Sequence, residues 1–234
     1  MDESRRDKSG EKEMRFKKLV GWGIALACMC LSFTAGTRYR YRSTLNIRPR
    51  KDMQALLARY FDGLGIPPEA MSLWIEKDGL CWLDLHDSAI SDLSVLEGIP
   101  LVELDIAATK VSDLAPLAKF TTLRSLNVSE TEVSDLSPLS KLPLDILNIS
   151  HTNIRDLSPI TNMSLRVLWI MQTAVTNADV IFQTDIDYLM FSSELFSEAQ
   201  LDKLRISKIR TINGYDSTRF WEWFDNRRVK RPAS

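Results

Sequence analysis

One set of residues combines titratable side chains of different kinds: His86 lies two residues after Asp84, and Glu103 and Asp105 follow further along the chain. A histidine beside carboxylates can transfer protons or bind a metal, because its pKa lies near neutral pH. The chain has only 2 histidines, and it contains no glycine-rich phosphate loop, nucleophile elbow or run of metal ligands. We interpret the cluster as a solvated acidic face, with an enzymatic or metal-binding role as the alternative. We therefore predict no enzymatic activity, no cofactor and no catalytic or metal-binding residue.

A column of aspartates is the second set of candidate ligands: Asp92, Asp113, Asp135 and Asp156. Three of them are followed closely by Pro116, Pro138 or Pro159, and two of these prolines lie in Ser-Pro pairs that a kinase could modify. Asp is a preferred N-cap because its carboxylate accepts orphaned backbone N–H groups, and Pro is tolerated in a first helical turn. We predict that this outer aspartate column caps short turns, with a row of cation sites as the alternative.

These aspartates belong to an internal repeat. Successive units read "LCWLDLHDSAISDLSVLEGIP" (80–100), "LVELDIAATKVSDLAPLAKFTT" (101–122), "LRSLNVSETEVSDLSPLSKLP" (123–143) and "LDILNISHTNIRDLSPITNMS" (144–164). A fifth unit (165–185) keeps the spacing without the "SDL" and the proline, and a sixth begins at 186. In "LxxLxL" the alternation predicts a short strand whose leucines point into a core. The Ser or Thr that follows each strand is expected to bond backbone groups freed by the turn.

The repeat resembles the leucine-rich-repeat family in its short class of about 22 residues, which includes a phosphatase-1 regulatory subunit and the bacterial internalins. The resemblance covers residues 80–193. It implies an α/β solenoid, a right-handed superhelix with a parallel sheet on its concave face.

Because one repeat cannot bury its own apolar side, both ends of the stack need caps. We predict an N-terminal cap over 52–79, with a helix at 52–65 opened by Asp52 and a hairpin at 72–85 that turns at Asp78-Gly79. We predict a C-terminal cap over 194–226, with a helix at 197–204, a strand at 205–212 and an aromatic helix at 216–228. A basic tail follows at 227–234.

The N-terminal part predicts a membrane anchor. A charged tail (1–18) precedes an uncharged, mostly apolar run. We predict that residues 19–37 form a transmembrane helix or signal anchor, and a basic linker (38–51) follows. At about 1.5 Å per residue such a helix just crosses a hydrocarbon core. We therefore predict a single-pass membrane protein with a bilayer contact through 19–37 and its repeats on the extracytoplasmic side. Cleavage, lipidation and a buried helix are the alternatives.

The resemblance also implies that the strand residues between the core positions line the concave face and bind a partner. That face is acidic at its N-terminal end, polar in the middle, and aromatic and apolar at its C-terminal end. Burial of the apolar part under the C-terminal helix is the alternative. The predicted partner-binding residues are Trp82, Asp84, Glu103, Asp105, Asn127, Ile146, Asn148, Val167, Trp169, Met171, Tyr188 and Met190.

We predict that the chain is a membrane-anchored protein–protein interaction module whose concave face binds a protein or peptide. Residues 80–200 carry 17 Asp and Glu against 6 Lys and Arg, and we expect no nucleic-acid partner. Two other functions stay open, a regulatory subunit of a membrane-associated kinase or phosphatase and a cell-wall or glycan binder.

Overall fold

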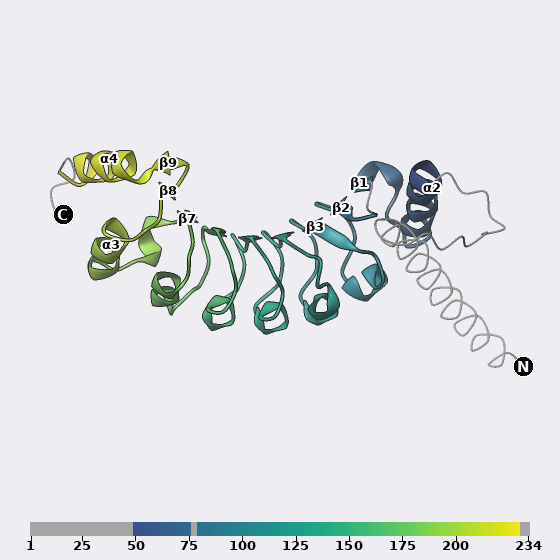
Figure 1. Ribbon diagram of the computed structural model, residues 1–234, viewed down its shortest axis with the longest axis horizontal. Helices are drawn as coiled ribbons and strands as arrows, with labels where there is room; N and C mark the ends of the chain where they lie inside the picture. The colour runs from purple at the N-terminus through teal and green to yellow at the C-terminus, as the bar shows by residue number, and fades with distance from the viewer. Residues whose placement is uncertain (1–48, 76–78, 230–234) are drawn as a thin grey trace, which may run out of the picture.

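A single curved sheet organises the molecule. The computed structural model describes residues 49–75 and 79–229. Figure 1 shows the strands along the inner side of an arc, with short coils on the outer side. The described residues form a nine-stranded sheet in chain order: β1 (Ser72–Ile75), β2 (Cys81–Asp84), β3 (Leu101–Asp105), β4 (Ser125–Asn127), β5 (Ile146–Asn148), β6 (Val167–Ile170), β7 (Tyr188–Phe191), β8 (Thr211–Ile212) and β9 (Tyr215–Asp216).

Neighbouring strands from β2 to β8 are parallel, and an antiparallel hairpin closes each end through β1 and β9. Each parallel step is one solenoid turn, because a strand can rejoin its neighbour in parallel only after the chain has crossed back. The fold is therefore a leucine-rich-repeat type of solenoid, as the repeat predicted.

The core runs between the sheet and the outer coils. Leu147 and Ile149 are both 0% exposed, and the same two positions are buried in the neighbouring repeats. The outer side of the third repeat supplies Val133, Leu136, Leu139 and Leu142, which are all buried. Burial of this apolar area is the main favourable term in folding.

The outer coils are short 3-10 helices: η3 (Leu93–Leu96), η4 (Ala115–Lys119), η5 (Ser137–Leu139), η6 (Ser158–Ile160) and η7 (Ala178–Gln183). The predicted role of the outer aspartate column is confirmed. Each carboxylate accepts the backbone N–H two residues on, with donor–acceptor distances of 2.7–2.8 Å. Asp92 is the N-cap residue itself, whereas in η4, η5 and η6 the aspartate stands one residue before the N-cap.

The predicted hydroxyl position after each strand is also confirmed. Thr109, Thr131 and Thr152 each donate a hydrogen bond of 2.6–2.7 Å to the backbone carbonyl three residues earlier. The residue before each threonine takes a left-handed conformation, as at Glu130 with φ 57°. The hydroxyl therefore satisfies a carbonyl where the chain turns sharply away from the sheet.

The N-terminal cap consists of α2 (Pro49–Asp62) and the β1–β2 hairpin. The helix includes residues 49–51 and so extends before Asp52, the predicted opening residue. Leu57 and Phe61 are fully buried, whereas Leu56 is 47% exposed and lies outside the buried face. The hydroxyl of Tyr60 donates a 2.9 Å hydrogen bond to the carbonyl of Val95 and joins the cap to the first repeat.

The C-terminal cap begins with α3 (Glu198–Arg205). Ser197 and Gln200 form a capping box at its start, so the predicted helix is confirmed. The predicted strand at 205–212 is wrong in extent, because only Thr211–Ile212 pairs with the sheet. The chain then turns back through Asn213 and Gly214, which both have positive φ as a two-residue hairpin requires.

The aromatic helix α4 (Ser217–Val229) packs on the end of the stack. Phe220 and Trp221 are buried, and the Phe220 ring lies edge-on to Phe191 of the last long strand. The Arg205 guanidinium lies 4.8 Å from the Trp221 ring centroid and forms two hydrogen bonds to Asp225. These contacts bind α4 to α3 and close the core.

The predicted membrane anchor at 19–37 lies outside the described residues, as do the tail at 1–18, most of the linker at 38–51 and residues 230–234. Across 49–75 and 79–229, no helix combines the length and apolar character needed to cross a membrane.

Removal of one core leucine tests the packing between repeats. Leu147 lies on the central strand and is fully buried, so Leu147→Ala leaves a cavity and should lower the free energy of unfolding by roughly 2–5 kcal/mol. The measurement is urea denaturation followed by circular dichroism. The exposed Lys141→Ala is the control, expected to change stability by less than about 0.5 kcal/mol. Equal effects of the two variants would contradict the assigned core.

Candidate functional site on the concave face

Strand register arranges the concave face into two rows. The first row joins Trp82, Glu103, Ser125, Ile146, Val167 and Tyr188, and the second joins Asp84, Asp105, Asn127, Asn148, Trp169 and Met190. The leucine between the two rows on every strand is buried in the core. Side chains alternate along a strand, so both rows face the inner side of the arc. Met171 follows the end of β6 and is half-buried.

A central groove of about 500 Å³ crosses this face. It joins the acidic and aromatic ends of the predicted site, and it is lined by Glu103, Asp105, Ser125, Leu126, Asn127, Ile146, Asn148, Val167, Trp169 and Tyr188. Eight of the predicted residues therefore share one concavity. Trp82 and Asp84 line a neighbouring hollow instead, and Met171 and Met190 lie beside the groove without lining it.

Four of the predicted residues have a structural task that the sequence did not show. Asp84, Asp105, Asn127 and Asn148 form an inner Asx column, in which each side-chain oxygen accepts the backbone N–H two residues on at 2.8–3.1 Å. This bond satisfies an N–H group freed at the end of the strand. Asn127 and Asn148 are register neighbours, and the Asn127 amide donates to Asp105 at 2.9 Å.

The inner Asx column ends at Trp169. Here the N–H of Met171 donates to the hydroxyl of Ser150, from the preceding repeat, at 3.2 Å. The neighbouring hydroxyl thus replaces the missing Asx oxygen, and position 169 is free to carry an aromatic ring. The indole Nε1 of Trp169 is buried and has no hydrogen-bond partner among the described residues. A large aromatic side chain therefore stands where the repeat would place a small capping residue.

The C-terminal helix leaves the groove open along its length. Figure 1 shows α4 beyond the last strands, and every residue lining the groove lies on β3–β7. The β8–β9 turn approaches Tyr188, whose hydroxyl lies 3.7 Å from the position that a Cβ on Gly214 would take. Trp169, Tyr188 and Met190 remain half-buried. The turn therefore bounds the groove at its C-terminal end.

Negative charge gathers at the other end. Burial raises the pKa of Glu103, and the charges of Asp105 and Asp84 raise it further. The hydrogen bond from His86 to Asp84, with 2.8 Å between Nδ1 and Oδ1, raises the pKa of that histidine. Of these groups, Asp105 accepts hydrogen bonds from Ala107 and Asn127, whereas the Glu103 carboxylate has no hydrogen-bond or ion-pair partner within the part of the chain that the structure describes.

Trp74 is an exposed residue beside this face that was not among the predicted binding residues. This residue lies directly opposite Trp82 in the β1–β2 hairpin, and the two side chains are 57% and 46% exposed. They line a hollow of about 280 Å³ together with Asp84, Glu103 and Asp105. The predicted turn did not reveal this pair, because a two-residue turn at Asp78-Gly79 would set residue 74 across from residue 83 instead of residue 82.

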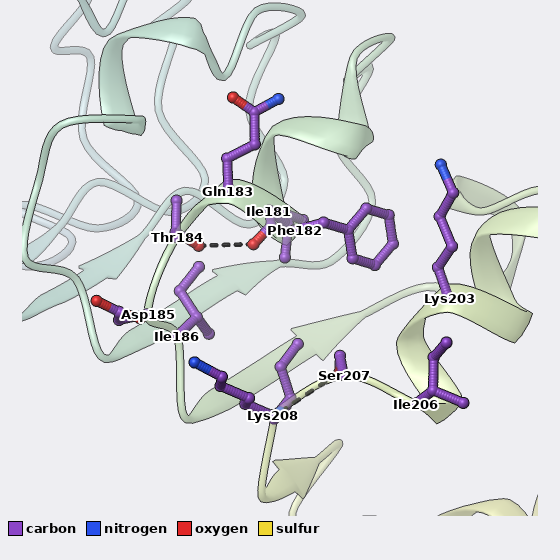
Figure 2. Close-up of a pocket in the computed structure, with 11 residues that line it drawn as sticks. Ile181, Phe182, Gln183, Thr184, Asp185, Ile186, Lys203, Ile206, Ser207 and Lys208 are labelled. Carbon is purple, nitrogen blue, oxygen red and sulfur yellow. Dashed lines mark hydrogen bonds between the residues drawn. The ribbon is translucent and has the colours of Figure 1, made fainter.

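A further hollow of about 370 Å³ lies where the last repeat meets the C-terminal cap (Figure 2), between segments 181–186 and 203–209. Lys203 forms a 3.0 Å ion pair with Asp179 and lies over the Phe182 ring, and Thr184 bonds the carbonyl of Ile181. None of the predicted binding residues lines this hollow. In residues 49–75 and 79–229, no group of three or more His, Cys, Asp or Glu side chains could hold a metal ion.

No protein-family model and no curated protein matches the chain. Similar solved structures include internalin C2 of Listeria monocytogenes, at 24% identity over 47% of this chain and 50% of that one, with a TM-score of 0.43. An internalin inlF of the same species is 22% identical over 53% and 44%, with a TM-score of 0.41. A leucine-rich-repeat protein of Leptospira interrogans is 18% identical over 54% and 35%, with a TM-score of 0.47. The chain spans half or less of the length of these proteins, and its own repeat unit defines the fold.

Neutralising Glu103 should stabilise the protein. Its pKa is raised above 4.5 in the folded state, so the folded protein binds this proton more tightly than the unfolded chain. Stability therefore falls as pH rises through the window between 4.5 and the raised value, and the deficit persists at neutral pH. Glu103→Gln should raise the midpoint of thermal unfolding at neutral pH, and the gain should shrink below pH 4.5.

The control is Glu132→Gln, an exposed glutamate one repeat further on, measured by calorimetry across the same pH range. A lower midpoint for Glu103→Gln at neutral pH would show that the carboxylate stabilises the fold instead.

Proposed function

We propose that the chain is a membrane-anchored protein-binding module whose concave face holds a polypeptide partner. The observation that carries the proposal is the central groove, which sets the half-buried Trp169 and Tyr188 beside the polar and acidic strand positions. Protein interfaces combine an aromatic, desolvated centre with a polar rim, and Trp and Tyr are enriched among the residues that dominate binding.

The two aromatic residues suit the role of anchors because their positions are fixed by the sheet. Tyr188 pairs with Val167 in the first row, and Trp169 occupies the second row between Asn148 and Met190. Rigid aromatic groups offer a large contact area at a small cost in conformational entropy. Together with Ile146 and Val167 they present one apolar surface to a partner.

The membrane part of the proposal comes from the sequence. The uncharged run within 19–37 is long enough to span a bilayer, and the basic residues of 38–51 suit contact with anionic headgroups. The module is then held close to the membrane on the extracytoplasmic side.

Replacement of both anchors tests the groove. Full-length protein is captured from detergent-solubilised membranes, and the bound proteins are quantified by mass spectrometry. The double variant Trp169→Ala, Tyr188→Ala should reduce the captured amount of a specific partner about tenfold or more. The reason is that loss of a buried aromatic anchor removes about 2 kcal/mol or more of binding free energy. Trp169→Phe should keep most of the binding, since it retains the ring face.

Lys141→Ala, an exposed change away from the groove, should leave capture unchanged, and thermal unfolding must show that each variant is folded. If the double variant retains every partner that the Lys141 variant binds, the groove is not the binding surface. Capture of a kinase or phosphatase would assign the module as a regulatory subunit, and capture of glycan alone would contradict a polypeptide partner.

Deletion of the apolar run tests the anchor. The full-length chain should stay in the membrane pellet after alkaline carbonate extraction, and a chain lacking residues 1–37 should become extractable. In intact cells, added proteinase should digest the repeats from the extracytoplasmic side. Release of the full-length chain by carbonate would contradict the anchor, while digestion only after cell lysis would reverse the proposed orientation.

A further inference from the structure

The two tryptophans at the N-terminal end of the concave face form an exposed aromatic pair. Trp74 and Trp82 are direct partners in the antiparallel register of β1 and β2, so their side chains lie on the same face. Each exposes about half of its surface. A cross-strand aromatic pair contributes some stability to a hairpin, but half-exposed indole rings also leave apolar area in contact with water.

Carboxylates stand directly beside this pair. Trp82 is the register partner of Glu103, and Asp84 is that of Asp105 on the same two strands. All of them line the hollow of about 280 Å³. Its size is below the usual range of about 300–1,000 Å³ for drug-sized ligands, and it suits a single side chain better than a whole small molecule.

The carboxylates of this hollow have no ion pair with a Lys or Arg side chain in residues 49–75 and 79–229. Ion pairs of Lys and Arg side chains lie at other carboxylates, among them Glu97, Asp145, Asp179, Asp187 and Asp225. Asp84 and Asp105 are held by hydrogen bonds from His86, Ala107 and Asn127. The Glu103 carboxylate lacks such a bond among the described residues and is half-buried, so an incoming cation would relieve its repulsion from the two aspartates.

We propose that Trp74, Trp82 and Glu103 form a recognition site for an arginine or lysine side chain of the polypeptide partner. The site rests on the proposed function and names the chemistry of the partner. A cation is attracted to the face of an indole ring, and a guanidinium can stack there while its N–H groups bond a carboxylate. Arginine is the better ligand, because its planar fork matches both surfaces.

The position of the site also sets the spacing of the partner's motif. The hollow and the central groove share Glu103 and Asp105, so one continuous surface runs from Trp74 to Tyr188. Four strand-to-strand intervals separate β2, which carries Trp82, from β6, which carries Trp169. At roughly 4.8 Å per interval, the distance is about 19 Å. An extended peptide covers that distance in about six residues at about 3.3 Å per residue. The partner segment therefore carries a basic residue and an apolar residue about six positions apart.

The experiment measures fluorescence anisotropy of labelled hexa-arginine, hexa-lysine and hexa-glutamate peptides with the full-length protein in detergent at low salt. Hexa-arginine should bind more tightly than hexa-lysine, and hexa-glutamate should not bind. Trp82→Ala and Glu103→Gln should each weaken hexa-arginine binding about fivefold or more, as loss of one cation–π or ionic contact predicts.

Matched controls separate this site from the general negative charge of the repeats. Glu132→Gln removes the same charge elsewhere, and Trp223→Ala removes a tryptophan that is 47% exposed at the opposite end. Both should bind hexa-arginine like the unchanged protein. Because Glu103→Gln should raise thermal stability, weaker binding by that variant cannot result from unfolding. Trp82→Phe should retain part of the affinity.

Equal binding by Glu103→Gln, Glu132→Gln and the unchanged protein would overturn the proposal, since the attraction would then be non-specific. Binding of a soluble oligosaccharide that depends on Trp82 but not on Glu103 would also overturn it and would assign the pair as a sugar-stacking surface. The proposed function is judged separately through Trp169 and Tyr188. One outcome would refute this site and leave the proposed function standing. In it, the Trp169 and Tyr188 double variant loses the partner, but Glu103→Gln binds hexa-arginine as well as the unchanged protein does.

Discussion

The solenoid depends on burial of a continuous apolar column between successive repeats. A single repeat of about 21 residues offers a strand of three to five residues and one short coil, too little to enclose its own leucines. Only when Leu126, Leu147 and Leu168 stack in register does each obtain neighbours on both sides. The parallel register, the arc and the two rows of the concave face all follow from this packing.

The backbone imposes a second requirement, because strands this short leave many N–H and C=O groups unpaired at their ends. In each repeat, side chains at three positions form hydrogen bonds to these backbone groups. The inner Asx column bonds the strand exit, the threonines bond the following turn, and the outer aspartate column bonds the 3-10 coils. Where one position is altered, as at Trp169, a neighbour such as Ser150 supplies the bond. The repeat can therefore carry a large aromatic side chain at position 169 without leaving the N–H of Met171 unbonded.

The ends of the stack are closed in different ways, and this shapes the surface. At the N-terminal end, the antiparallel strand β1 extends the concave face and adds Trp74 to it. At the C-terminal end, the tight β8–β9 turn approaches Tyr188, while α4 packs its aromatic side chains on the end of the core. Each cap pairs with the backbone of a terminal strand and thereby also limits the extent of the concave surface.

Much of the architecture followed from the sequence alone. The period, the alternation in "LxxLxL" and the recurring Asp and Pro residues specified the parallel strands, the buried column and the capped coils, because these depend on local patterns that repeat. The capping serine of α3 was equally readable. The sequence did not show where α2 starts or how far the last strand extends, since both depend on how each cap packs against the repeats.

The sequence predicted which residues lie on the concave face but not the structural roles of their side chains. Sequence placed the twelve residues on one face, because strand alternation and repeat spacing determine which positions line it. Only the tertiary structure showed that Asp84, Asp105, Asn127 and Asn148 bond their own backbone, that the Met171 N–H bonds Ser150 in place of an Asx oxygen at position 169, and that Trp74 and Trp82 pair across the hairpin beside Glu103. The Asx bonds span only two residues, whereas the other two relations join different repeats or a repeat and its cap. These two relations depend on distances between segments that folding brings together, and no local pattern records those distances.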